Sequence, residues 1–75
     1  MEVRGKHALI VGMAKSGIAS AKLLAEEGAI VTINDRKAEA QLEESLDPLK
    51  GLPIVNALEK DPMTLLDGCD LIVLS

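Results

Sequence analysis

A turn bounded by Gly12 and Gly17 separates an apolar run at residues 8–11 from a stretch with helical periodicity at residues 16–27. The first backbone N–H groups of a helix have no partner inside the helix, and the helix dipole favours negative charge beside them. A strand, a glycine turn and a helix in this order therefore predict the phosphate-binding turn of a Rossmann-like domain. Gly12 is expected to allow the tight turn, and Gly17 the close contact between helix and sheet.

The rest of the chain alternates between strand and helix patterns. Strands are expected at residues 6–11, 29–33, 54–55 and 70–75, and helical segments at residues 16–27, 38–46 and 62–66. The inner helix faces are expected to consist of Ile18, Ala21, Leu24, Ala25, Leu42, Leu46 and Leu49. The alternation predicts one α/β domain over residues 1–75. This domain has three layers and a parallel sheet of about four strands in the order 3-2-1-4.

The carboxyl ends of parallel strands meet at one edge of the sheet, and ligands bind there. This edge is expected to collect residues 12–17, Asp35, Arg36, the loop after Val55, and Ser75. The Ser16 hydroxyl can bond a phosphate oxygen, cap the helix, or do both.

Asp35 ends the second strand 18 residues after Gly17. A carboxylate at this place commonly accepts hydrogen bonds from a ribose, although a plain strand-end turn residue is the alternative. In a dinucleotide site, Asp35 would select NAD, whereas Arg36 could bind a 2′-phosphate. Ala14 stands where the dinucleotide fingerprint has a glycine, and its methyl group keeps a pyrophosphate farther from the backbone.

Gly12 and Gly17 also match the two glycines of a Walker A loop. The lysine and the hydroxyl residue that should follow the second glycine are replaced by Ile18 and Ala19. Without them the turn is not expected to support ATP hydrolysis.

Composition argues against several partners. The net charge is −4, and the chain contains no Phe, Trp or Tyr. Phosphate neutralisation and base stacking are therefore both disfavoured, and nucleic acid is not expected as a partner. No apolar run reaches the roughly 18 residues of a membrane span, and the N-terminus lacks a signal-peptide pattern. No membrane partner is therefore expected.

The reactive side chains are few. Cys69 is the single cysteine and cannot form an internal disulfide, which fits a reducing cytoplasm. Neither His7 nor Cys69 has sequence neighbours at metal-binding or nucleophile spacing, so we expect no metal site and no catalytic residue. The chain ends on the strand-like run at residues 71–75, which predicts a fragment of a larger protein.

Three segments carry a family resemblance: residues 11–17 (VGMAKSG), 31–35 (VTIND) and 70–75 (DLIVLS). In their order and spacing they resemble the N-terminal domain of the Mur ligase family. The resemblance implies a uridine-nucleotide site with six residues around the ligand. Lys15, Ser16 and Gly17 would face the diphosphate and ribose, Asp35 and Arg36 would lie against the uracil, and Ser75 would line the same pocket. Family members often carry a hydroxyl residue where Arg36 stands, so only backbone contact to uracil is expected there.

The resemblance also implies a reaction. Members of this kind phosphorylate the carboxylate of UDP-N-acetylmuramoyl-L-alanine with ATP, and the amine of D-glutamate then attacks the acyl phosphate, in bacterial peptidoglycan synthesis. ATP, Mg²⁺ and D-glutamate would bind to central and C-terminal domains that these 75 residues lack. The chain alone would be an inactive substrate-anchoring domain without a cofactor. Two alternatives stay open: an NAD(P)-binding domain of a dehydrogenase or nucleotide sensor, and a scaffold that binds nothing.

Overall fold

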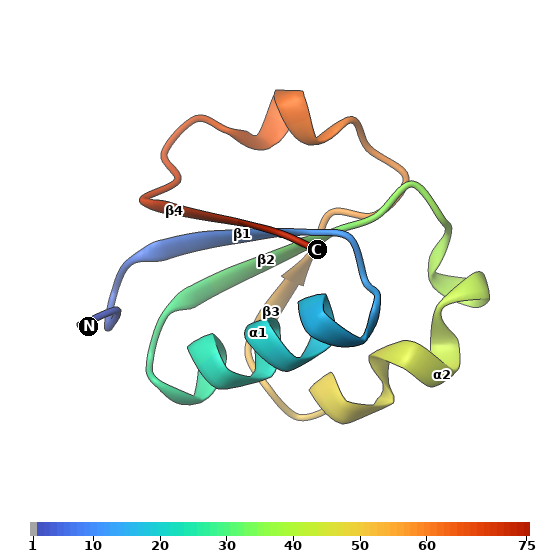
Figure 1. Ribbon diagram of the computed structural model, residues 1–75, viewed down its shortest axis with the longest axis horizontal. Coiled ribbons are helices and arrows are strands. Elements are labelled where there is room, and N and C mark those ends of the chain that lie inside the picture. The colour runs from blue at the N-terminus through green and yellow to red at the C-terminus, as the bar shows by residue number, and fades with distance from the viewer. Residues whose placement is uncertain (1) are drawn as a thin grey trace.

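The computed structural model describes residues 2–75 and contains a parallel sheet of four strands (Figure 1). The strands are β1 (His7–Val11), β2 (Ile30–Asn34), β3 (Ile54–Asn56) and β4 (Leu71–Leu74). Their order in the sheet is β3-β2-β1-β4, and each neighbouring pair is parallel. The predicted α/β fold and strand order are therefore confirmed.

The helix α1 (Lys15–Glu26) packs its predicted apolar face against the sheet. Ile18, Ala21, Leu24 and Ala25 are all buried in the core. The small side chain of Ala21 is completely buried, which allows the helix axis to approach the strands closely. The helix ends before Gly28, whose φ of +94° is the left-handed conformation that follows many helices.

The expected continuous helix at residues 38–46 is wrong. The segment divides into a 3₁₀ turn η1 (Glu39–Gln41), a single α-turn α2 (Glu43–Leu46) and a second 3₁₀ turn η2 (Asp47–Leu49). The break falls at Leu42, whose φ of −111° lies outside the helical region. The Gln41 side chain accepts a hydrogen bond from the Ala38 N–H, which closes the first turn on itself.

Tertiary packing explains why this broken segment is stable. Leu42 and Leu49 are buried, and the half-buried Leu46 packs against the same core. Ser45 and Asp47 have weak helix propensity, and Pro48 lacks an N–H for an intrahelical bond. The three leucines predicted from periodicity thus reach the core, but from a segment of short turns in place of one helix.

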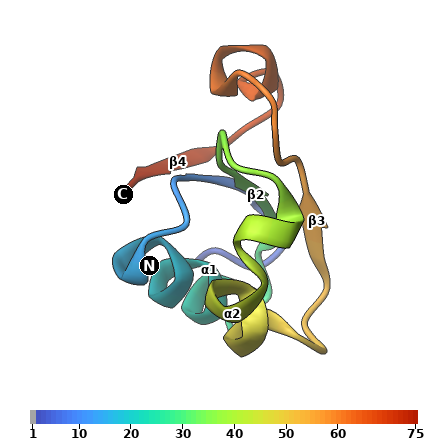
Figure 2. The same cartoon turned by 90° about the vertical axis from the view of Figure 1, so that its right-hand side faces the viewer.

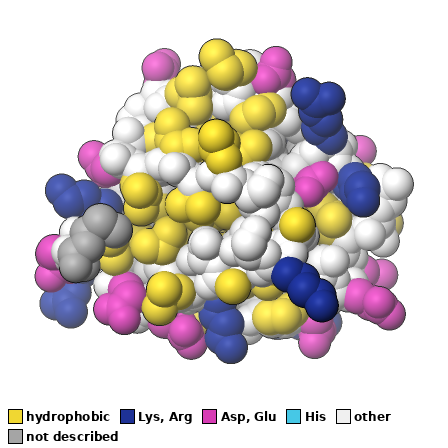
Figure 3. Space-filling view, viewed as in Figure 1, with side chains coloured by type: hydrophobic (Ala, Val, Ile, Leu, Met, Phe, Trp, Pro, Cys, Tyr) yellow, Lys and Arg dark blue, Asp and Glu magenta, His cyan; other side chains and the backbone are white. Residues whose placement is uncertain are grey.

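The two faces of the sheet are covered unequally. The helices α1 and α2 lie on one face, and the connection from β3 to β4 crosses the other with a 3₁₀ turn η3 (Pro62–Leu65) (Figure 2). Asp61 caps this turn as expected, because its side chain accepts a hydrogen bond from the Met63 N–H. Hydrophobic side chains on η3 and β4 stay open to solvent, among them Met63, Ile72 and Leu74. Figure 3 shows hydrophobic side chains gathered on one face of the molecule. The third predicted layer is therefore a single turn.

Candidate functional site

The glycine turn between β1 and α1 depends on both of its glycines. Gly12 has a φ of +95°, and its N–H donates to the Asn34 carbonyl at 2.8 Å. Gly17 lies in the first turn of α1, and a Cβ there would collide with the Gly12 carbonyl oxygen. The tight turn at Gly12 is thus as predicted. Gly17 was expected to allow close contact between helix and sheet, but it packs against the turn itself and Ser75.

The N-terminus of α1 is not capped by a side chain. Its N-cap residue is Ala14, which has no polar side-chain atom, and the first turn contains Lys15 but no acidic residue. The interpretation of Ser16 as an N-cap is therefore wrong, since Ser16 stands inside the helix. The positive end of the helix dipole is left without a compensating carboxylate in that turn, which favours binding of an anion.

Ser75 lies directly beside this helix end. Its N–H donates to the Val11 carbonyl at 3.0 Å, continuing the ladder between β4 and β1. The hydroxyl oxygens of Ser16 and Ser75 are 2.8 Å apart and share a hydrogen bond. A Cβ placed on Gly12 would come within 3.3 Å of the Ser75 Cβ, so Ser75 packs against the glycine turn. Both hydroxyls face solvent, because both residues are exposed.

Asp35 is bonded to the same turn through its carboxylate. Oδ2 accepts a hydrogen bond from the Met13 N–H at 2.8 Å, and Oδ1 accepts one from the Lys37 N–H at 2.9 Å. Burial alone would raise the pKa of the Asp35 carboxyl. The backbone N–H groups of Lys37 and Met13, the Lys37 charge and the Arg36 N–H outweigh it and hold the pKa below its ordinary value.

The buried Asn34 was not predicted to take part in this edge. Its side chain is only 1% exposed, and its amide nitrogen donates to the carbonyls of Ala57 and Lys60, each at 2.9 Å. The loop so held contains Glu59 with a φ of +61°, and the Glu59 N–H donates to the Asp35 carbonyl at 2.8 Å. The only sequence signal for this role was an amide residue closing an otherwise apolar strand.

The two basic residues of the predicted site line different hollows. Arg36 lines a hollow of about 260 Å³ with residues 59–62 of the loop that Asn34 holds. Lys15 lines a hollow of about 700 Å³ between α1 and α2, together with Met13 and Lys22. The site residues therefore form a row along the sheet edge. Gly12, Ser16, Gly17 and Ser75 are in direct contact, and Asp35 is joined to them through Met13.

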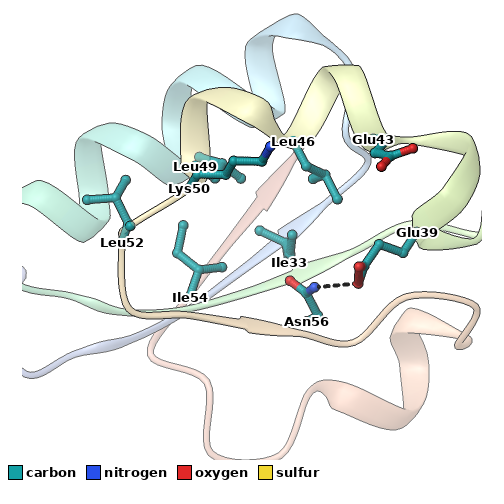
Figure 4. Close-up of a pocket in the computed structure, with 10 residues that line it drawn as sticks. Ile33, Glu39, Glu43, Leu46, Leu49, Lys50, Leu52, Ile54 and Asn56 are labelled. Carbon is teal, nitrogen blue, oxygen red and sulfur yellow. Dashed lines mark hydrogen bonds between the residues drawn. The ribbon is translucent and has the colours of Figure 1, made fainter.

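Another hollow of about 330 Å³ lies between the broken helical segment and the strands β2 and β3 (Figure 4). Its walls include Ile33, Leu46 and Ile54, and its rim carries Asn56, whose amide donates to the Glu39 carboxylate at 3.1 Å. None of the predicted site residues lines it. It is separate from the glycine turn.

Within residues 2–75, no three His, Cys, Asp or Glu side chains are grouped so that they could hold a metal ion. His7 is exposed, and the half-buried Cys69 directs its thiol to the Leu65 carbonyl at 3.2 Å. The same residues include no helix with the length and apolar character that crossing a bilayer requires.

The fold and this edge define a class: a Rossmann-like α/β domain whose glycine turn opens onto the N-terminus of a helix. No protein-family model matches the chain. The chain is similar to UDP-N-acetylmuramoylalanine–D-glutamate ligases of several bacteria. It is 47% identical over 72 residues to that of Shouchella clausii and 42% identical over 72 residues to that of Exiguobacterium sibiricum, with 96% of the chain covered in each case. It is 37% identical over its whole length to that of Geobacter metallireducens.

These alignments cover 16% to 17% of the relatives' length. Nearly the whole chain matches one segment of these relatives, which are all named UDP-N-acetylmuramoylalanine–D-glutamate ligase. The resemblance carried by the three sequence segments is thereby confirmed.

Proposed function

We propose that this chain is the uridine-nucleotide-anchoring domain of a ligase that joins D-glutamate to UDP-N-acetylmuramoyl-L-alanine. The observation that carries the proposal is the start of α1. Its N-terminus has neither a side-chain cap nor an acidic residue, and the Ser16 and Ser75 hydroxyls meet beside it. The unpaired N–H groups and the two hydroxyls can donate hydrogen bonds to a diphosphate, and the positive end of the helix dipole favours its negative charge.

The diphosphate would lie against Lys15, Ser16, Gly17 and Ser75. Lys15 stands in the first turn of α1 beside the hollow between α1 and α2, and its positive charge would reach the diphosphate from there. Gly17 allows the helix start to pack against the turn and Ser75, because a Cβ there would meet the Gly12 carbonyl oxygen and the Ser75 side chain. Since Gly12 and Gly17 fix the turn by close backbone contact, the N–H groups are arranged before the ligand arrives. Such preorganisation reduces the entropy lost on binding.

The uracil would lie at the end of β2, against Asp35 and the backbone of Arg36. The hollow of about 260 Å³ that Arg36 lines supports this assignment, since Arg36 directly follows Asp35 in the chain. The Asp35 carboxylate already accepts two backbone N–H bonds. Since a carboxylate has about four lone-pair sites, about two remain for donors of a ligand.

The proposed reaction takes place in the bacterial cytoplasm and belongs to the whole ligase. ATP and Mg²⁺ activate the muramoyl-alanine carboxylate as an acyl phosphate, and the amine of D-glutamate displaces the phosphate. The chain spans about a sixth of its relatives' length, and the proposal assigns ATP, Mg²⁺ and D-glutamate to the remainder. These 75 residues would bind the nucleotide end of one substrate and perform no chemistry alone.

The test is an amide NMR titration of the ¹⁵N-labelled chain with UDP and, separately, with NAD⁺. NMR suits this protein because it has no Trp or Tyr to report binding optically. We expect UDP to shift the amides of Lys15, Ser16, Gly17, Asp35 and Ser75, and NAD⁺ to leave them unchanged. Shifts with NAD⁺ alone would replace the proposal by a dinucleotide site. Silence with both would contradict nucleotide anchoring and favour a scaffold.

A further inference from the structure

The last residue of β2 and the one after it make contacts on both sides. Toward β1, the Asn34 carbonyl accepts the Gly12 N–H and the Asp35 carboxylate accepts the Met13 N–H, each at 2.8 Å. Toward β3, the Asn34 amide and the Asp35 carbonyl hold the loop at residues 57–60. Two adjacent residues therefore fix the two loops that flank the candidate site.

The bond to Met13 has a specific geometric consequence. Met13 lies between Gly12, whose left-handed φ turns the chain, and Ala14, which begins the helix without a side-chain cap. The direction of the Met13 peptide unit therefore sets where the first N–H groups of α1 point. Because the second carboxylate oxygen of Asp35 is bonded to the Lys37 N–H, the carboxylate is held from two sides and cannot rotate freely.

Electrostatics disfavours a direct phosphate contact by the same group. A carboxylate one residue away from an anion site repels a diphosphate. A ribose hydroxyl or a uracil N–H could bond it, but so could the turn alone. The hydrogen bonds of Asp35 therefore fit a carboxylate that contributes to ligand binding by ordering the N–H donors of the turn. A charge-assisted bond to a backbone N–H is stronger than a neutral one.

We infer that Asp35 is a positioning residue of the nucleotide site: its carboxylate orients the Gly12–Gly17 turn, and through that turn it supports diphosphate binding. The inference rests on the proposed function, in that the turn is taken to hold the diphosphate. It adds a second role to the one proposed above, in which the residue lies against the uracil.

The experiment compares D35N with D67N in the chain. Asp67 is the control, since it is an exposed aspartate that lines none of the hollows described above. Each variant is titrated by amide NMR with UDP, with inorganic pyrophosphate and with uridine. We expect D35N to weaken the binding of both UDP and pyrophosphate, about five- to tenfold, and D67N to change neither.

A D35N variant that loses affinity for UDP and uridine but keeps that for pyrophosphate would overturn the inference, because the residue would then act only on the nucleoside and not through the turn. Unchanged affinity for all three probes would also overturn it. Asn keeps one carbonyl oxygen for the Met13 N–H whereas Ala keeps none, so the order wild type, D35N, D35A in protection of the Met13 amide from hydrogen exchange is expected. If D35A does not fold, the comparison of wild type with D35N alone tests whether the Asp35 carboxylate protects the Met13 amide.

Failure of the proposed function gives a different pattern. If the wild-type chain binds neither UDP nor pyrophosphate, nucleotide anchoring is contradicted. The positioning role is then tested only by the amide shifts and hydrogen exchange of the turn residues. Shifts and faster exchange confined to residues 12–17 in D35N would still support it. Turn amides that stay as in the wild type would overturn it.

Discussion

The side-chain hydroxyls of Ser16 and Ser75 lie 2.8 Å apart although 59 positions separate them in the chain. One stands in the first turn of α1, and the other follows β4, the strand that pairs with β1. The contact exists because parallel strands deliver their carboxyl ends to one edge, and because Gly12 and Gly17 leave room for Ser75 in the turn. It joins the two chain segments that would share the diphosphate.

Replacing Ser16 or Ser75 by Ala should weaken UDP binding with little effect on folding. Each change removes one exposed hydroxyl that could bond a phosphate oxygen, and the expected loss is about three- to tenfold in Kd for either variant. NMR titration measures it, and S45A serves as the control because Ser45 is an exposed serine of α2. Equal Kd values for S16A, S75A and wild type would remove both hydroxyls from the site.

Replacing Gly17 by Ala should destabilise the fold, although Ala is ordinarily the better helix residue by about 1 kcal/mol. The added Cβ would collide with the Gly12 carbonyl and approach the Ser75 side chain within 3.1 Å. Backbone must move to relieve the first contact, so we expect a loss of about 2–3 kcal/mol in urea denaturation followed by far-UV circular dichroism.

The control for Gly17 is Gly51, which has a φ of +84° and no atom within 4 Å of the position that a Cβ would take. The G51A variant should lose only the conformational cost of a left-handed alanine, about 1 kcal/mol. A G17A variant no less stable than G51A would show that the turn can open without cost.

Replacing Asn34 by Ala should be more costly than replacing Asn56. The Asn34 amide is buried and supplies donors to two backbone carbonyls, so its removal leaves the Ala57 and Lys60 carbonyls without that partner. We expect a loss of about 2–4 kcal/mol for N34A. Asn56 is exposed and its amide donates only to the Glu39 carboxylate, so N56A should lose less than about 0.5 kcal/mol. Similar losses for the two variants would contradict the assigned role of Asn34.

Sequence patterns predicted the frame of the site but not its internal bonds. Apolar runs and glycine positions indicated the strand order, and the rule for parallel sheets then placed Ser75 beside the turn at Gly12. The bond from Met13 to Asp35 spans 22 positions and depends on how two strand ends are aligned, which no local pattern encodes. Local propensity also made Ser16 one candidate for the helix cap, although the register of the turn gives that position to Ala14.

The prediction of one continuous helix at residues 38–46 was wrong for a related reason. Leucine spacing correctly identified Leu42 and Leu49 as core residues. It could not reveal that the short distance between β2 and β3 is bridged by three separate turns, because the break at Leu42 comes from tertiary packing and from the Gln41 bond to Ala38. Periodicity reports which side chains are buried more reliably than it reports a continuous helix.

The Asp35 contacts predict a pH dependence of stability. The pKa of this carboxyl is lowered in the folded chain, by backbone donors at Lys37, Met13 and Arg36 and by the Lys37 charge, which together outweigh the opposing effect of burial. A lowered pKa means that the carboxylate stabilises the fold fully above its unfolded pKa of about 3.9, and that this contribution disappears as pH falls through the folded value.

The excess stability of wild type over D35N should therefore be constant from pH 7 to about pH 5 and should shrink as the pH is lowered toward 3. Urea denaturation at a series of pH values measures it, and the other carboxylates cancel because they titrate in both proteins. The exposed Asp67 provides the control, since the difference between wild type and D67N should stay near zero throughout. A wild-type advantage over D35N that persists undiminished at pH 3 would mean that the charge on Asp35 does not hold the turn.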